Sequence, residues 1–423
     1  MNQTLVGKIA ANTLYQLFGK LITVLVTIVV TFSVTRHFGV QGYGEFNVMQ
    51  AFPALFFIIA DFGLNAIVTK ALSENWDNAK SYFGNLITLR IVMSLLLIFL
   101  AALVLTAFPY SATLKTGIYL SLFLVLVQSL YASTNVIFQS QLKYHYSTAG
   151  LAAGSLVVLI FTVVFSYMKL AVMWISFSYV IGGLVTFLIN IQFIRKLGLA
   201  PSLGFDRRLW ISMLSQAWPI GITFVFSQIN FKADSLMLSV LNLPLRYGLN
   251  NVEAVAIYGL PYKIFEVSLV IPTFFMNSVY PVYVRHLLLG KEKLLSTFWK
   301  TLAVLTGSGL LLSLVGIIFA PYAVSLLGGD GFIGSTGALR LLLLGLPIFF
   351  ITQPISWLLV TLGRQKYLPI IYLAAAVFNV SANLYFIPRY SFFASSVITW
   401  LSEILILIML SIFARKAWTS HNA

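Results

Sequence analysis

Long apolar runs separated by short polar stretches fill this chain from one end to the other. Runs of about 20 apolar residues are long enough to cross a bilayer as helices. We therefore predict twelve membrane-spanning helices, at about 12–34, 44–67, 83–108, 117–138, 149–167, 171–193, 211–241, 252–284, 297–320, 337–361, 367–387 and 393–413.

Composition supports this interpretation, because 60% of the 423 residues are hydrophobic and only 9% are charged. Soluble domains carry about 25% charged residues. The longest connection, 197–210, divides the spans six and six. The predicted fold is an all-α polytopic membrane protein with an amino-terminal bundle at 1–196, a cytoplasmic linker at 197–210 and a carboxy-terminal bundle at 211–423.

The two predicted bundles resemble a parallel repeat. Span 6 ends in FIRK at 193–196, and span 12 ends in FARK at 413–416. Lys143-Tyr144 precedes span 5, as Lys366-Tyr367 precedes span 11. Six-helix halves of equal orientation imply a pseudo-two-fold axis along the membrane normal, and substrate sites then favour the interface between the halves.

The net charge of +15 lies largely in the loops. The amino-terminal side and the even-numbered loops carry most of these cations, among them Arg195, Lys196, Arg207 and Arg208. The odd-numbered loops hold fewer, namely Arg36, Lys115, Lys169, Arg246 and Arg389. The positive-inside rule places both termini in the cytoplasm and makes orientation, rather than nucleic-acid binding, the role of this charge.

Several charged residues fall inside otherwise apolar spans: Lys20, Asp61, Lys232, Asp234, Lys263, Glu266 and Glu403. A charge at the centre of a membrane helix costs about 2.5–3.5 kcal/mol on insertion scales. These groups must therefore face a wet cavity or one another. A water-filled cavity through a membrane protein indicates a transport function.

Span 1 carries one polar stripe, in which Gln16, Lys20 and Thr23 recur at spacings of 3 or 4 residues. The stripe either lines a cavity, or it consists of threonines bonded to their own helix and a lysine reaching for the surface. Asp61 in span 2 is either a cavity residue or an interfacial acid. Both alternatives stay open on the sequence alone.

Spans 7 and 8 are the most polar. Gln228 and Lys232 share one face of span 7, while Asp234 lies on another, so the two charges cannot pair along one helix face. Glu266 and Asn277 lie along one side of span 8, where Lys263 and Glu266 are close enough to neutralise each other. Pro261 and Pro272 allow that helix to kink.

The remaining signals are weaker. Asn379 and Asn383 share a face of span 11, and Glu403 is a lone carboxylate in span 12; hydrogen bonding between helices explains these as well as substrate contact does. Gly150 and Gly154 indicate close helix packing. The chain has no cysteine, no phosphate-binding Gly-Lys-Ser/Thr loop and no Ser-His-Asp set, so we predict no enzyme activity, no metal site and no cofactor.

Lysines in spans 1, 7 and 8 make the predicted cavity cationic, which suits an anionic substrate such as a phosphate or pyrophosphate head group. The stretch RHFGVQGYGEF at 36–46 resembles the segment after the first helix in Wzx-type polysaccharide-unit flippases. ADFGL at 60–64 is similar to the end of their second span. These flippases belong to the multidrug/oligosaccharidyl-lipid/polysaccharide exporter superfamily, and the likeness extends over the whole chain.

The resemblance implies a V-shaped cavity between two bundles, with spans 1, 2, 7 and 8 at its centre. The implied substrate is an undecaprenyl-pyrophosphate-linked oligosaccharide, moved from the inner to the outer leaflet of the bacterial cytoplasmic membrane by alternating access. Lys20, Lys232 and Lys263 would be its cavity cations, and Asp61, Asp234, Glu266 and Glu403 would be candidates for H⁺ or Na⁺ coupling. Other membrane proteins of polysaccharide assembly are expected partners. The alternative is an ion-coupled multidrug or small-solute antiporter.

Overall fold

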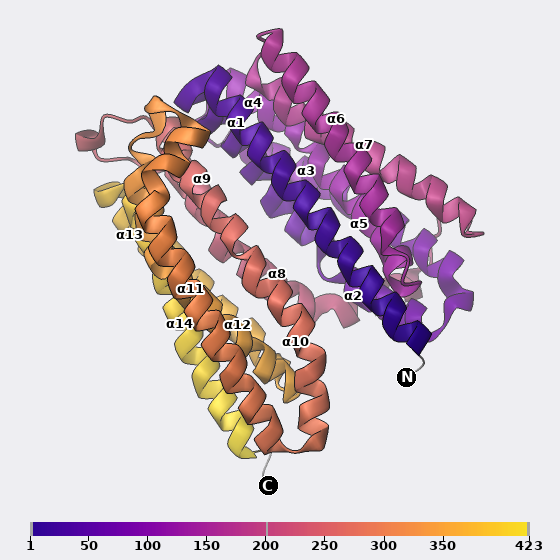
Figure 1. Ribbon diagram of the computed structural model, residues 1–423. Helices are drawn as coiled ribbons and strands as arrows, with labels where there is room; N and C mark the ends of the chain where they lie inside the picture. Colours follow the sequence, from indigo (N-terminus) through magenta and orange to yellow (C-terminus); the bar gives the residue numbers. More distant parts are fainter. Residues whose placement is uncertain (1–2, 200–201, 421–423) are drawn as a thin grey trace. The chain divides into compact units, whose positions relative to one another are not determined.

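The computed structural model describes residues 3–199 and 202–420, which form helices joined by short turns, with no strand among them (Figure 1). Eleven helical segments in this part of the chain are long and apolar enough to cross a membrane. The first of them, Leu14–Glu74, has 61 residues. At 1.5 Å per residue it measures roughly 90 Å, about three bilayer cores, and so it contains the first two predicted spans.

Helix α1 (Gln3–Asp61) is interrupted only at Gly39, where φ is 64° and ψ is −161°. This backbone conformation favours glycine, while the space around the glycine is open. The predicted loop between spans 1 and 2 is therefore a one-residue break between two helices. With α1 counted as two spans, the structure contains the twelve that the hydrophobic pattern predicts.

The chain divides by its contacts into two compact units, Met1–Val225 and Phe226–Ala423. The first contains α1 and α2 (Leu64–Glu74), α3 (Ala79–Thr106), α4 (Ala112–Ser121), α5 (Phe123–Ser140), α6 (Tyr144–Tyr167), α7 (Val172–Lys196) and the first half of α8 (Arg207–Val240). The second contains the rest of α8, then α9 (Asn251–Ser268), α10 (Val270–Leu289), α11 (Lys291–Gly328), α12 (Ser335–Thr361), α13 (Leu368–Tyr390) and α14 (Phe392–Ser420).

The division between the two units lies inside α8. Met213 and Ala217 of α8 belong to an apolar core built mainly by α2, α3 and α5. The loop before α8 is fastened to α3, since the Asp206 backbone N–H donates to Asn85 Oδ1 at 2.6 Å. The start of α8 is therefore part of the first unit.

Helices α6 and α7 of the first unit pack very closely, as Gly150 and Gly154 predict. A Cβ atom added at Gly154 would lie 2.0 Å from Thr186 Oγ1 and 2.4 Å from the carbonyl oxygen of Gly182. A Cβ at Gly150 would lie 2.0 Å from Asn190 Oδ1. Only glycine allows the two backbones to approach this far.

In the second unit, α9 and α10 form one interrupted span. Asn250 and Glu253 form a capping box that starts α9, and the helix breaks at Leu269. Pro272 lacks the N–H that would bond the carbonyl oxygen of Ser268, which explains a break at this point. The kink allowed by the sequence is thus observed, three residues before the proline.

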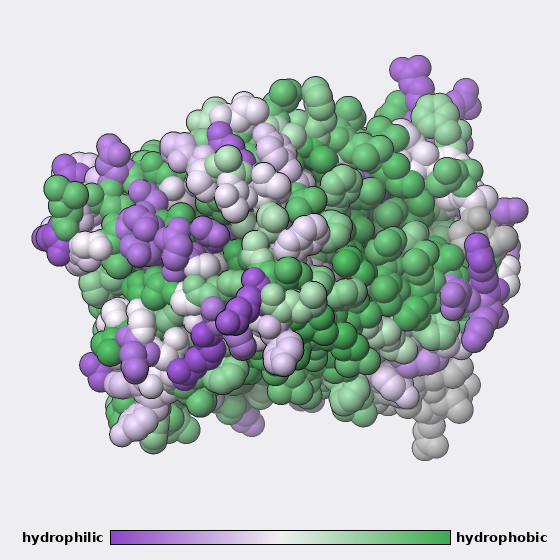
Figure 2. Space-filling view, turned by 90° about the horizontal axis from the view of Figure 1, so that it is seen from above, coloured by the Kyte–Doolittle hydropathy of each residue, from purple (hydrophilic) through white to green (hydrophobic). Residues whose placement is uncertain are grey.

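Apolar side chains dominate the visible face of the protein in Figure 2, with hydrophilic residues gathered in separate clusters. Exposed apolar residues occur on helices of both units, for example Phe99 on α3, Val163 on α6 and Leu311 on α11. A soluble protein rarely exposes apolar surface on this scale. The pattern is that of helices whose outer faces contact lipid.

Candidate functional site

A charged cluster in the second unit joins α8 to α9. The Glu266 carboxylate accepts from Lys232 Nζ at 3.1 Å through Oε1 and from Lys263 Nζ at 2.9 Å through Oε2. Lys232 Nζ also lies 5.8 Å from the centre of the Tyr262 ring, whose hydroxyl donates to the carbonyl oxygen of Phe231. Two lysines and one glutamate leave the cluster with a formal charge of +1.

The cluster remains accessible, since the exposed fractions are 25% for the Lys232 side chain, 36% for Lys263 and 41% for Glu266. A lysine ammonium group has three donors, so Lys232 can bond a further acceptor beside Glu266. Lys263 pairs with Glu266 on its own helix, which is the alternative that their i,i+3 spacing had left open. Lys232 finds its partner on another helix, as the two-residue spacing to Asp234 requires.

Asp234 forms a separate, buried network and is only 1% exposed. Its Oδ2 accepts from the hydroxyls of Tyr258 at 2.8 Å and Thr399 at 2.9 Å, and its Oδ1 accepts from Asn383 Nδ2 at 2.8 Å. Asn383 Nδ2 also contacts Asn379 Oδ1 at 3.1 Å. The side chains around this carboxylate come from α9, α13 and α14, and those that bond it are uncharged.

Glu403 on α14 is a third acidic site in this unit and is 6% exposed. Its Oε1 accepts a short hydrogen bond from Thr352 Oγ1 of α12. Glu403 lines a cavity of about 220 Å³ together with residues of α8, α10, α12 and α13. The structure therefore brings Lys232, Lys263 and Glu266 together and holds Asp234 and Glu403 in different surroundings.

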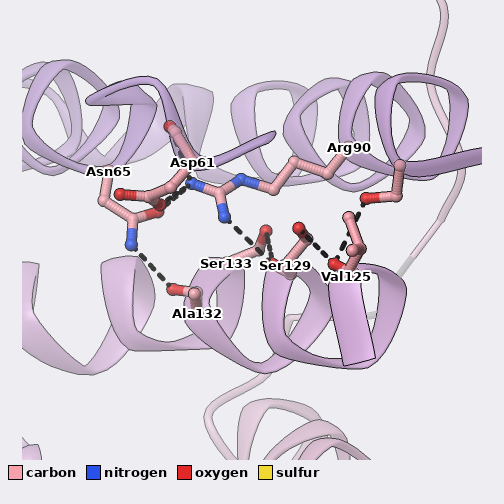
Figure 3. Close-up of polar contacts among 8 residues, drawn as sticks. Asp61, Asn65, Arg90, Val125, Ser129, Ala132 and Ser133 are labelled. Carbon is pink, nitrogen blue, oxygen red and sulfur yellow. Dashed lines mark hydrogen bonds and ion pairs between the residues drawn. The ribbon is translucent and has the colours of Figure 1, made fainter. Parts of the chain in front are cut away.

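In the first unit, Asp61 at the end of α1 pairs with Arg90 of α3 (Figure 3). Arg90 Nη2 lies 2.6 Å from Asp61 Oδ1 and 2.9 Å from Asn65 Oδ1, while Nη1 donates to the carbonyl oxygen of Ser129 at 3.2 Å. Arg90 is fully buried. The pair joins the ends of α1 and α2 to α3 and α5.

Arg90 was not among the predicted site residues, although it lies inside the predicted span 83–108. Its signal is available, because a single arginine interrupts a long apolar run there. The partner of Arg90 cannot be predicted in this way, since spacing along a sequence does not show which helix an arginine faces. Asp61 is therefore paired with a buried cation in the structure.

The polar stripe of span 1 has mixed surroundings. Thr23 Oγ1 donates to the carbonyl oxygen of Gly19 at 3.0 Å, so this threonine bonds its own helix. Asn12, which lies four residues before Gln16 on the same stripe, accepts through Oδ1 from the backbone N–H of Tyr144 at 2.7 Å and so joins α1 to α6. Lys20 is exposed and Gln16 is half-buried. In the second unit Gln228 is half-buried and Asn277 is exposed.

Comparisons with known proteins agree with this architecture. The model of the family described as polysaccharide biosynthesis protein matches residues 9–287, and the MatE model matches residues 219–385. No curated protein matches the sequence significantly.

Solved structures of the same fold cover nearly the whole chain. An inward-facing multidrug resistance transporter of the MATE family and the MOP superfamily has a TM-score of 0.75 at 14% identity, covering 94% of this chain and 95% of its own. The lipid II flippase MurJ, in an inward closed conformation, has a TM-score of 0.73 at 14% identity, covering 94% and 87%. A MOP-superfamily transporter from Pyrococcus furiosus, described as having a binding pocket of reverse polarity, has a TM-score of 0.65 at 14% identity, covering 98% and 95%.

The fold and the polar sites inside its helices define a multi-pass membrane protein with the transporter and flippase fold of the MOP superfamily. The chain belongs to the polysaccharide biosynthesis protein family, whose model matches more than half of its length. A Wzx-type flippase, which the motifs at 36–46 and 60–64 resemble, is consistent with both results.

Proposed function

We propose that this protein moves undecaprenyl-pyrophosphate-linked oligosaccharide units from the cytoplasmic to the outer leaflet of the bacterial inner membrane by alternating access. The observation that carries the proposal is the accessible Lys232–Glu266–Lys263 cluster with its formal charge of +1. Pyrophosphate oxygens are strong acceptors, and charge-assisted hydrogen bonds to lysine are among the stronger contacts a protein makes. Lys20, Gln16, Thr23, Gln228 and Asn277 remain proposed substrate contacts.

The test is leaflet transfer in proteoliposomes that carry a fluorescent undecaprenyl-pyrophosphate oligosaccharide. A membrane-impermeant quencher reports each molecule that reaches the opposite leaflet. We expect transfer at least about tenfold faster than in protein-free vesicles. A cationic dye loaded into parallel vesicles tests the alternative function. Dye efflux with no lipid transfer would establish the multidrug antiporter instead.

We further propose that Asp234 binds the coupling ion, H⁺ or Na⁺. A carboxylate buried among uncharged donors is costly unless a proton or a cation neutralises it. Asp61 and Glu266 already have basic partners. Hydroxyl and amide oxygens around Asp234, together with the carboxylate, are ligands that suit a hard cation. Glu403 is the second candidate for this role.

Asp234→Asn is expected to abolish the stimulation of leaflet transfer by an imposed Na⁺ or pH gradient, because the amide neither releases a proton nor offers a charge to a cation. The measurement compares transfer rates with and without each gradient. Asp330→Asn, an exposed residue of the α11–α12 turn, is the matched control and should respond as the wild type does. A wild-type protein that responds to neither gradient, or an Asp234→Asn variant with full stimulation, would contradict coupling at this residue.

A further inference from the structure

The cavity that contains Glu403 lies wholly within the second unit and differs in chemistry from the lysine cluster. Its volume is about 220 Å³, and its walls come from α8, α10, α12, α13 and α14. A single water needs only about 10–15 Å³ of such volume, so the cavity admits a group of many heavy atoms. Its size makes it a candidate ligand site rather than a packing defect.

The wall of the cavity offers both donors and acceptors. Gln353 and Ser356 of α12 and Tyr372 of α13 line the cavity together with Glu403, and Thr352 of α12 bonds the Glu403 side chain. The hydroxyl of Thr352 bonds one oxygen of the Glu403 carboxyl group, and a carboxyl group has further acceptor sites whether it is ionised or protonated. Glu403 therefore has acceptor capacity left for a ligand that donates.

The remaining wall is largely apolar and aromatic, with Phe231 of α8 and Phe349 of α12 among its members. The residues that line the cavity include no lysine or arginine, so its charge does not suit a phosphate. Hydroxyl groups arranged around a ring with apolar C–H faces match this combination of carboxylate, amide, hydroxyl and aromatic side chains. This is the chemistry of a monosaccharide.

Residues that line the cavity are neighbours in sequence of the lysine cluster. Phe231 directly precedes Lys232 on α8, and Leu269 lies three residues after Glu266. Ser227, which also lines the cavity, lies five residues before Lys232 on α8, or roughly 7 Å along the helix axis. A pyrophosphate held by the cluster thus has its attached sugar within reach of the cavity.

We propose that this cavity binds the sugar joined directly to the pyrophosphate and selects it through Gln353, Ser356 and Glu403. The inference rests on the proposed flippase function. It deepens that function by assigning the anion and the sugar to separate, adjacent sites on the second unit. Recognition of the first sugar then depends on α12 and α14, while recognition of the pyrophosphate depends on α8 and α9.

The test uses the purified full-length protein in nanodiscs and soluble probes, with binding measured by calorimetry. The probes are farnesyl pyrophosphate and a panel of farnesyl pyrophosphates that each carry one hexose or N-acetylhexosamine. We expect at least one glycosylated probe to bind about tenfold more tightly than farnesyl pyrophosphate, as two good hydrogen bonds allow. Gln353→Ala and Ser356→Ala should remove this gain and leave the binding of farnesyl pyrophosphate unchanged.

Gln365→Ala, at an exposed glutamine in the α12–α13 turn, is the matched control and should preserve the gain. Equal affinity of the wild type for all probes, or a gain that survives in Gln353→Ala and Ser356→Ala, would overturn the sugar site. A different result would contradict the proposed flippase function: farnesyl pyrophosphate would then bind equally well to the wild type and to Lys232→Ala.

Discussion

Arg90→Leu is expected to destabilise the protein by about 3–5 kcal/mol, the usual cost of removing one member of a buried ion pair. The substitution leaves Asp61 without its cation and removes the donors to Asn65 and the Ser129 carbonyl. Four helices meet at this guanidinium, so the loss affects the whole first unit. The measurement is the thermal unfolding midpoint of the purified protein in detergent.

Arg340→Leu is the matched control, because Arg340 is exposed and its Nε donates at 3.3 Å to a single carbonyl oxygen. We expect its midpoint to stay close to that of the wild type. Asp61→Leu combined with Arg90→Leu should recover part of the loss, since no unpaired charge remains buried. Equal midpoints for Arg90→Leu and Arg340→Leu would show that the buried pair contributes little to stability.

The charged cluster on α8 and α9 is expected to set the affinity for pyrophosphate through its net charge. Lys232→Ala lowers the formal charge from +1 to zero, and we expect it to weaken the binding of farnesyl pyrophosphate about tenfold or more. Glu266→Gln raises the charge to +2 and removes the carboxylate that competes with the substrate, so affinity should rise. Calorimetric titration at low and high salt measures both effects, and salt should reduce them.

Opposite signs in the two variants separate a charge effect from a loss of packing, which would weaken binding in both. Lys293→Ala, at an exposed lysine near the start of α11, controls for the overall charge of the protein. Weaker binding in Glu266→Gln as well as in Lys232→Ala would mean that Glu266 positions the lysines rather than competing with the substrate.

The fold follows from the sequence because the bilayer imposes one length on every span. Apolar runs of about 20 residues identify the membrane helices directly. The connection at Gly39 is harder to predict. A helix that continues on both sides of one glycine has the same sequence pattern as a helix followed by a loop. The pattern predicts the number of spans but not the form of the turn.

The candidate site is predicted in part. The spacing of Lys232 and Asp234 requires partners on other helices, and the structure supplies Glu266 for one and Tyr258, Thr399 and Asn383 for the other. Which helix would supply them depends on packing between segments far apart in the chain. Periodicity within one helix contains no such information, so the sequence does not show that Arg90 is the partner of Asp61.

The position of the division inside α8 has a consequence for gene fusion. A chimera joined to a relative in the loop before α8 would keep the first unit but replace Met213 and Ala217, which fill its core. The fused protein would then combine the apolar core of one parent with the first half of α8 from the other, whose side chains pack against a different core. A domain-swap experiment therefore needs a junction inside α8, so that the first half of this helix stays with the amino-terminal unit.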